Sequence, residues 1–225
     1  MTFLIYFIII MALPIIIQMY LKNTYNKHLK IPASSGMTGA QAARKVLDEN
    51  GLYNVSIEPV KGQLSDHYDP SSKVVRLSEN NYYGSSIAAV SVATHEVGHA
   101  VQDAEDYAFL RVRHKLVPVA NAGSKFSFFF ILAGMLFAST NMLLLGIIFF
   151  AAAVLFQVVT LPVEFNASSR ALTSMVGSGL IRNDEEGSAK KVLNAAALTY
   201  VAATVIAIVE LLRFVLMFVG MRNND

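Results

Sequence analysis

Two histidines four residues apart, with a glutamate between them, are the side chains of this sequence best suited to chemistry. His95 and His99 enclose Glu96 in the pattern H-E-x-x-H. Residues four apart lie on one face of a helix, so both imidazoles can reach one ion, and Glu96 lies about 100° round the helix, within reach of a water at that ion. Zinc suits this arrangement best, and we predict one catalytic Zn²⁺. A helix with two solvated histidines is the alternative, but it gives His no packing reason to recur at this spacing.

A catalytic zinc also needs a third protein ligand and an open coordination position. The sequence contains no Cys, so the third ligand must be a histidine or a carboxylate. The candidates besides Glu164 are His28, His67, His114, Asp66, Asp69, Asp103, Glu105 and Asp106. The choice among them depends on which residues the fold brings to the side of His95.

The composition indicates where such a site can lie. Of the 225 residues, 54% are apolar and 15% are charged, which is too apolar for an ordinary soluble fold. The apolar residues gather in runs of about 20, the length of a helix that crosses a bilayer. We predict a mainly α, polytopic membrane protein with four transmembrane helices and a small cytoplasmic α+β segment that carries the HExxH helix. The net charge of +2 gives nucleic-acid binding no electrostatic support.

The four predicted spans are residues 3–21, 117–138, 142–161 and 192–219. The apolar run from 117 to 161 would be about 65 Å long as one helix, roughly twice the thickness of a bilayer core, so it must fold back. The polar cluster at 139–141 supplies the turn. The predicted organisation is an anchor at 1–21, a segment at 22–116, a helical hairpin at 117–161, a segment at 162–191, and a last span with a short tail at 192–225.

Basic residues predict the orientation of the chain, because cytoplasmic flanks carry an excess of them. Those on one side are Lys22, Lys27, Lys30, Arg111, Arg113, Lys115, Arg170, Arg182, Lys190 and Lys191, whereas the other side has Arg222. We predict a multi-pass protein of the cell membrane in which residues 22–116 and 162–191 face the cytoplasm and both termini lie outside.

Glu164 stands out among the candidates for the third ligand. It follows Pro162 at the cytoplasmic end of the third span, and two membrane crossings separate it from His99. Two crossings return the chain to the side of the membrane on which His95 and His99 lie. A cytoplasmic helix within 162–191 can therefore carry the third metal ligand. The alternative is an acidic residue in the first turn of a helix that starts after Pro162, where it would interact favourably with the helix dipole.

The segment 22–116 carries local signals for two helices. Thr38 and Gln41 form a capping-box pattern, and Gly51 stands where a helix ending near residue 50 needs a left-handed residue. Ser85 or Ser86 is placed to cap the helix that carries the HExxH motif. A small domain with one amphipathic helix and the motif helix is therefore expected.

The same segment is predicted to contain two short strands, at 54–60 and 73–77, separated by a polar loop at 66–70. The strand at 73–77 could bind an extended substrate through its edge. Hydrolysis commonly needs a further electrophile beside the developing oxyanion, and His67, Tyr68 or Arg170 could supply it. We take His67 as the candidate catalytic residue; the alternative is a loop histidine in a turn.

Two strings of this sequence resemble a known family. THEVGHAVQ at 94–102 and LPVEFNASSRAL at 161–172 resemble the YugP-like family of membrane zinc metallopeptidases. They are more loosely similar to the HtpX and CAAX-protease type, in which a Glu on a later helix completes HExxH. The resemblance covers nearly the whole chain, including DHYDP at 66–70 and AAALTYVAA at 195–203. It implies a zincin-like segment of the gluzincin type, with His95, His99 and Glu164 as zinc ligands and Glu96 as general base.

The sequence departs from these families at two positions near Glu164. Asn166 stands where an Asp is usual in the family, and Ser168 stands where the HtpX-like pattern often has an Asp. Asn166 can still form a hydrogen bond to a ligand imidazole, but it adds no negative charge. Its support of zinc affinity is therefore the part of the site that the resemblance leaves in doubt.

The predicted function is a zinc-dependent metalloendopeptidase that hydrolyses membrane or membrane-adjacent polypeptides at the cytoplasmic face. Protein quality control follows from family analogy alone. The first alternative is a scaffold or chaperone-like protein with a closed, structural zinc site. The second, an ion transporter, is disfavoured because the spans carry few polar residues, and Glu210 and Arg213 are interpreted as a helical ion pair. The sequence has no signal for an oligomeric state or a regulatory partner.

Overall fold

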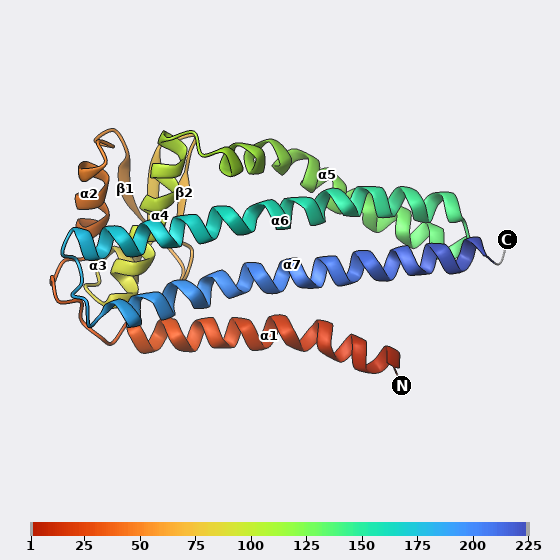
Figure 1. Ribbon diagram of the computed structural model, residues 1–225, viewed down its shortest axis with the longest axis horizontal. Helices are drawn as coiled ribbons and strands as arrows, with labels where there is room; N and C mark the ends of the chain where they lie inside the picture. Colours follow the sequence, from red (N-terminus) through yellow and green to blue (C-terminus); the bar gives the residue numbers. More distant parts are fainter. Residues whose placement is uncertain (1, 224–225) are drawn as a thin grey trace. The chain divides into compact units, whose positions relative to one another are not determined.

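The computed structural model describes the backbone of residues 2–223 and the side chains of residues 6–223. These residues form seven helices and a small sheet (Figure 1), which confirms the predicted fold class. The elements are α1 (Thr2–His28), α2 (Gly39–Glu49), β1 (Ser56–Val60), β2 (His67–Asp69), β3 (Val74–Ser78), α3 (Glu79–Tyr83), α4 (Ile87–Ala104), α5 (Ala108–Leu136), α6 (Thr140–Gly177) and α7 (Glu186–Arg222).

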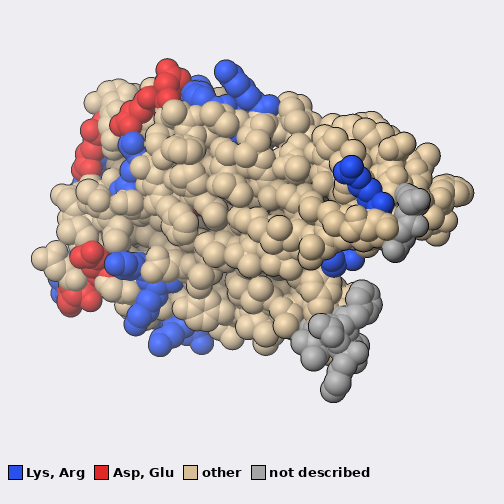
Figure 2. Space-filling model, turned by 45° about the vertical axis from the view of Figure 1, so that its right-hand side comes forward, with Lys and Arg blue, Asp and Glu red and all other residues tan. Residues whose placement is uncertain are grey.

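Four of the described helices are long and apolar enough to cross a membrane. The candidate spans are Tyr6–His28, Ala108–Leu136, Thr140–Gly177 and Glu186–Arg222. Many of their large apolar side chains are exposed, as expected for surfaces that face lipid. Figure 2 shows a surface with wide areas free of charge and with its Lys, Arg, Asp and Glu side chains gathered in a few groups. The sequence-based prediction of four spans is confirmed.

The chain divides into two compact units. One comprises Met1–Ile10, Ala108–Pro162 and Tyr200–Asp225, and the other comprises Met11–Tyr107 and Val163–Thr199. The first holds most of the α5–α6 hairpin and the second holds the sheet, α2, α3 and α4. Because the second unit contains the HExxH motif and Glu164, the candidate site belongs to one unit.

Small residues allow the two helices of the hairpin to pack closely. A Cβ built on Gly134 would lie 2.6 Å from the backbone nitrogen of Leu143, and one on Gly146 would lie 2.7 Å from that of Ile131. Such close backbone approach is typical of helix packing inside membranes. α5 ends at Leu136 and α6 begins at Thr140, so the predicted fold-back near residues 139–141 is confirmed.

α6 differs from its prediction at Pro162. The sequence suggested that the third span ends at residue 161 and that a new helix starts after Pro162, yet α6 is continuous from Thr140 to Gly177. A proline inside a helix removes one backbone donor, and a long helix held by many other hydrogen bonds tolerates the loss. Glu164 therefore lies within a helix, and its interpretation as a first-turn acid is wrong.

The signals for α2 are confirmed in detail. The Thr38 hydroxyl accepts a hydrogen bond from the backbone N–H of Gln41, and the Gln41 side chain accepts one from the backbone N–H of Thr38. Gly51 follows the helix with a φ of +72°, the left-handed conformation that the sequence predicted. The apolar face of α2 is buried in the core of this unit, together with parts of α4, β3 and the end of α6.

The sheet has one strand more than predicted, and its order corrects one functional expectation. The order is β1-β3-β2, with β1 parallel and β2 antiparallel to β3. β2 lies where the sequence suggested a loop, because three residues next to Pro70 are too few to show an alternating pattern. β3 lies in the middle of the sheet, so the strand near 73–77 has no free edge for a substrate. The free edges belong to β1 and β2.

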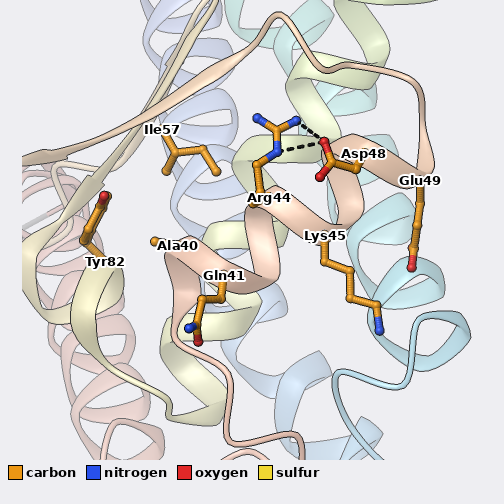
Figure 3. A pocket seen from close by; sticks show the side chains of 8 residues that line it. All are labelled: Ala40, Gln41, Arg44, Lys45, Asp48, Glu49, Ile57 and Tyr82. Carbon is orange, nitrogen blue, oxygen red and sulfur yellow. Dashed lines mark hydrogen bonds and ion pairs between the residues drawn. The ribbon is translucent and has the colours of Figure 1, made fainter.

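A hollow of about 690 Å³ lies beside α2, near Ile57 of β1 and Tyr82 of α3 (Figure 3). Its charged side chains interact with one another and with backbone groups of the same unit. Arg44 contacts Asp48 at 2.6 Å and also donates to the backbone oxygens of Val55 and Leu52. These contacts hold the loop that leads into β1.

Candidate metal centre

α4 presents the HExxH motif from the interior of the second unit. The helix begins after Ser86, whose hydroxyl accepts a hydrogen bond from the backbone N–H of Ala89, so the predicted cap is the second of the two serines. Ala93 and Val97, on another face of the helix, are fully buried in the core. Because these residues fix the rotation of α4, the motif side chains face the end of α6.

The structure brings His95, His99 and Glu164 together. The Nε2 atom of His95 lies 3.3 Å from Oε2 of Glu164, and Nε2 of His99 lies 3.6 Å from the same oxygen. One ligand atom from each of the three side chains lies within 4.8 Å of the others. All three side chains are largely buried, and Glu164 is 3% exposed. The sequence-based choice of Glu164 from a distant helix thus agrees with the geometry.

The spacing of these atoms fits a zinc ion. Zinc binds His nitrogen and carboxylate oxygen at about 2.0–2.2 Å, usually with tetrahedral geometry, so neighbouring ligand atoms lie about 3.3–3.6 Å apart. The two nitrogen–oxygen distances of 3.3 and 3.6 Å fall in this range. Two imidazoles and one carboxylate are also a donor set that catalytic zinc sites use. The residues present therefore form a candidate zinc site.

Glu96 is buried next to this group. Its residue is 8% exposed, and burial raises the pKa of its carboxyl group, although His95 and His99 oppose the shift. Burial lowers the pKa of His99, but the hydrogen bond and charge of Glu164 outweigh burial and raise it overall. A buried carboxylate next to a place for a cation is a candidate general base.

The other acids and histidines proposed as third ligands have different partners. Asp66 accepts hydrogen bonds from Ser78 and Asn81, Asp69 from Ser71, Ser72 and Arg76, and Asp103 from Tyr68 and Lys73. Glu105 pairs with Arg170, and Nδ1 of His28 contacts the backbone oxygen of Thr24. In the part of the chain that the structure describes, His95, His99 and Glu164 form the one group able to hold a metal ion.

The proposed electrophiles lie outside the metal group. His67 is exposed on β2, and its Nδ1 contacts the backbone oxygen of Ser65 at 2.9 Å. The hydroxyl of Tyr68 donates to Asp103, and Arg170 interacts with Glu105 and Asn166. A catalytic role of His67 stays a prediction.

Two side chains next to the ligand histidines were missing from the sequence-based site. The side-chain oxygen of Gln102 lies 3.0 Å from Nδ1 of His99, and the hydroxyl of Ser168 lies 3.2 Å from Nδ1 of His95. Asn166 does not support an imidazole directly, as the sequence suggested, but contacts Gln102. The signal for Gln102 was its position three residues after His99 on the same helix.

A HExxH helix joined by a glutamate from a later helix, in a chain with four long apolar helices, defines the class of membrane zinc metallopeptidases. The sequence pattern of the family described as "Putative neutral zinc metallopeptidase" matches residues 3–219, and this chain belongs to that family. It is 56% identical over 208 residues to the "Putative membrane protease YugP" of Bacillus subtilis (strain 168), covering 92% of each chain. No solved structure matches it. The family resemblance found in the sequence is confirmed.

Proposed function

We propose that this chain is a membrane-embedded metalloendopeptidase that hydrolyses membrane or membrane-adjacent polypeptides at the cytoplasmic face, with one catalytic zinc ion. The observation that carries the proposal is the buried group of His95, His99 and Glu164 with Glu96 beside it. The family and the relative described as a membrane protease support the same activity.

The side chains of the site would have different roles in hydrolysis. His95, His99 and Glu164 would hold the ion, which when bound polarises a carbonyl group and acidifies water. The carboxylate of Glu96 accepts a proton from the attacking water and delivers it to the nitrogen of the departing amine. Glu96 lies next to the two ligand histidines on the same helix, which places its carboxylate within reach of a water at the ion.

The sheet offers a way to hold an extended substrate. α4 packs against β2 and β3, and β2 is the free edge on that side of the sheet. A substrate segment added to β2 would form main-chain hydrogen bonds that do not depend on its sequence. His67 lies on this strand, so it remains the candidate for the electrophile beside the reacting carbonyl.

Zinc content and peptide hydrolysis, measured together on detergent-purified protein, test the proposal. We expect about one zinc per native chain. We expect Glu96→Gln to keep zinc and lose roughly 10²–10⁴-fold in hydrolysis of an unfolded protein substrate, and Glu164→Ala to lose both. Glu79→Gln, which changes an exposed acid of the same unit, is the matched control and should behave as native.

Two outcomes would contradict this proposal. Native protein that holds zinc while no variant cleaves any unfolded substrate would favour a scaffold or chaperone-like protein with a structural zinc site. Unchanged zinc content in Glu164→Ala would mean that another residue supplies the third ligand.

A further inference from the structure

The amide of Gln102 is fully buried and uses both of its ends. Its Nε2 donates to the backbone oxygen of Val163 at 2.8 Å and to Oδ1 of Asn166 at 2.9 Å, and its Oε1 contacts Nδ1 of His99 at 3.0 Å. Val163 and Asn166 stand on either side of Glu164 in α6. We infer that Gln102 is a positioning residue that fixes which ring nitrogen of His99 faces the metal group and holds α6 beside α4 at the third ligand.

The direction of these hydrogen bonds follows from their partners. The backbone oxygen of Val163 can only accept a hydrogen bond, so the NH₂ end of the Gln102 amide must face it. The oxygen end then faces His99, and this oxygen can only accept. The proton of a neutral His99 must therefore lie on Nδ1, which leaves the lone pair of Nε2 for the metal group.

Arg170 fixes the direction of the hydrogen bond between Gln102 and Asn166. Arg170 has only donors, and its Nε donates to Oδ1 of Asn166 at 2.8 Å. The oxygen of Asn166 is thus directed toward both Arg170 and Gln102, and accepts from each. Arg170 also pairs with Glu105 at the end of α4, at 2.7 Å. Two hydrogen bonds of Gln102 and the ion pair between Arg170 and Glu105 therefore join the two ligand helices.

The other ligand imidazole lacks such a constraint. Its neighbour Ser168 has a hydroxyl that can donate or accept, so the contact with His95 at 3.2 Å is compatible with a proton on either ring nitrogen. The two histidines of the motif are consequently supported in different ways. The tautomer of His99 is set by the network, and that of His95 is free to follow the ion.

Substitutions of Gln102 can separate the effect of its hydrogen bonds from the effect of its side-chain volume. Gln102→Met keeps an unbranched side chain of similar length and removes the three polar contacts of the amide. Gln102→Glu would place a carboxylate against two acceptors, the oxygens of Val163 and Asn166. Gln63→Met is the matched control, because it makes the same change at an exposed glutamine of the same unit, whose amide donates to Asn26 and not to this network.

The first test measures zinc affinity by competition with a chelator. We expect Gln102→Met and Gln102→Glu to bind zinc about 10–100-fold more weakly, and Gln63→Met to stay within about threefold of native. The inference rests on the proposed zinc site, and the outcomes separate the two. Native protein that binds no zinc defeats the proposed function, whereas native-like affinity in Gln102→Met defeats the positioning role alone.

The second test reads the tautomer directly and needs no metal. In zinc-free native protein at alkaline pH, where both rings are neutral, ¹H–¹⁵N spectra of labelled histidine show which nitrogen carries the proton. We expect the His99 proton on Nδ1, and expect Ser168→Ala to alter the signals of His95 and leave those of His99. A His99 proton on Nε2 would overturn the inference.

Discussion

Gly98, between the two ligand histidines, lies at a close approach of α4 and α6. A Cβ built there would lie 2.7 Å from the backbone oxygen of Ala167 and 3.2 Å from its Cα. Both of these atoms belong to the backbone, so neither can turn aside as a side chain could. The glycine is therefore required by the distance between the helices, and that distance lets Glu164 reach the imidazoles.

Gly98→Ala is expected to force the two helices apart. Overpacking a tight contact costs typically about 1–3 kcal/mol, and here it should also weaken zinc binding because the ligands come from both helices. Thermal unfolding and chelator competition measure the two effects. Gly177→Ala, at the end of the partner helix α6 and with no atom within 4 Å of the added carbon, is the control. Equal behaviour of the two variants would contradict the close approach.

Asp69 makes the connection between β2 and β3 sensitive to acid. The hydroxyl of Ser72, then Arg76 and the backbone N–H groups of Ser71 and Ser72, hold the pKa of Asp69 well below its usual range. Because the folded-state pKa is lowered, the stabilisation is present above the unfolded-state value of about 3.9 and is lost as the pH falls through the folded-state value.

Asp69→Asn should therefore lower the stability of the chain more at pH 7 than in acid. The comparison is the unfolding midpoint of native and variant protein at pH 7 and near pH 2, where the native carboxylate has begun to lose its advantage. A midpoint difference that is equal at both pH values would show that the charge of Asp69 is not responsible.

The helices show how far sequence patterns lead. Apolar runs and caps predicted the four candidate spans, α2 and α4, because these signals depend on residues close in sequence. The sequence pattern did not predict that α6 continues through Pro162, because the hydrogen bonds of a long helix outweigh the local effect of one proline. The sequence pattern did not predict β2 either, because its three residues form a strand only through their pairing with β3.

Some residues of the candidate site could be predicted from the sequence, and others depend on how the helices pack. His95, Glu96 and His99 are recognisable from spacing on one helix, and Glu164 from the number of membrane crossings. Gln102 has no signal of that strength, because its role depends on the backbone oxygen of Val163, a group present at every residue. The supporting hydrogen bonds of a metal site thus require the packing of α4 on α6.

The last long helix carries an ion pair that confirms its sequence-based interpretation. Nη2 of Arg213 lies 2.8 Å from Oε2 of Glu210, and the guanidinium also lies 4.4 Å from the ring centre of Phe214. The hydroxyl of Tyr6 in α1 donates to the same glutamate. α1 and α7 are thereby joined by polar contacts within their apolar sequences.

Arg213→Leu should leave the charge of Glu210 without its cation and destabilise the protein by roughly 2 kcal/mol or more. Glu210→Leu combined with Arg213→Leu removes both charges and should recover most of the loss. Thermal unfolding in one detergent compares the three proteins. If the double variant were as unstable as Arg213→Leu, packing would account for the effect better than charge.

The orientation of the entire chain in its membrane is the broadest expectation from the sequence. Since the protein has no Cys, single cysteines are clean probes of sidedness. We expect Thr140→Cys to react with an impermeant maleimide applied to intact cells, and Ser72→Cys to react only after permeabilisation. Labelling of Ser72→Cys from outside would reverse the topology and place the site on the other face.

The order of the elements along the chain sets the order in which the residues of the metal group are synthesised. His95 and His99 leave the ribosome well before Glu164, and the α5–α6 hairpin separates them. Until that hairpin has been inserted and has brought the chain back, two imidazoles have no carboxylate to complete their site. A chain in which α6 has not packed beside α4 would therefore lack the carboxylate that lies next to the two imidazoles.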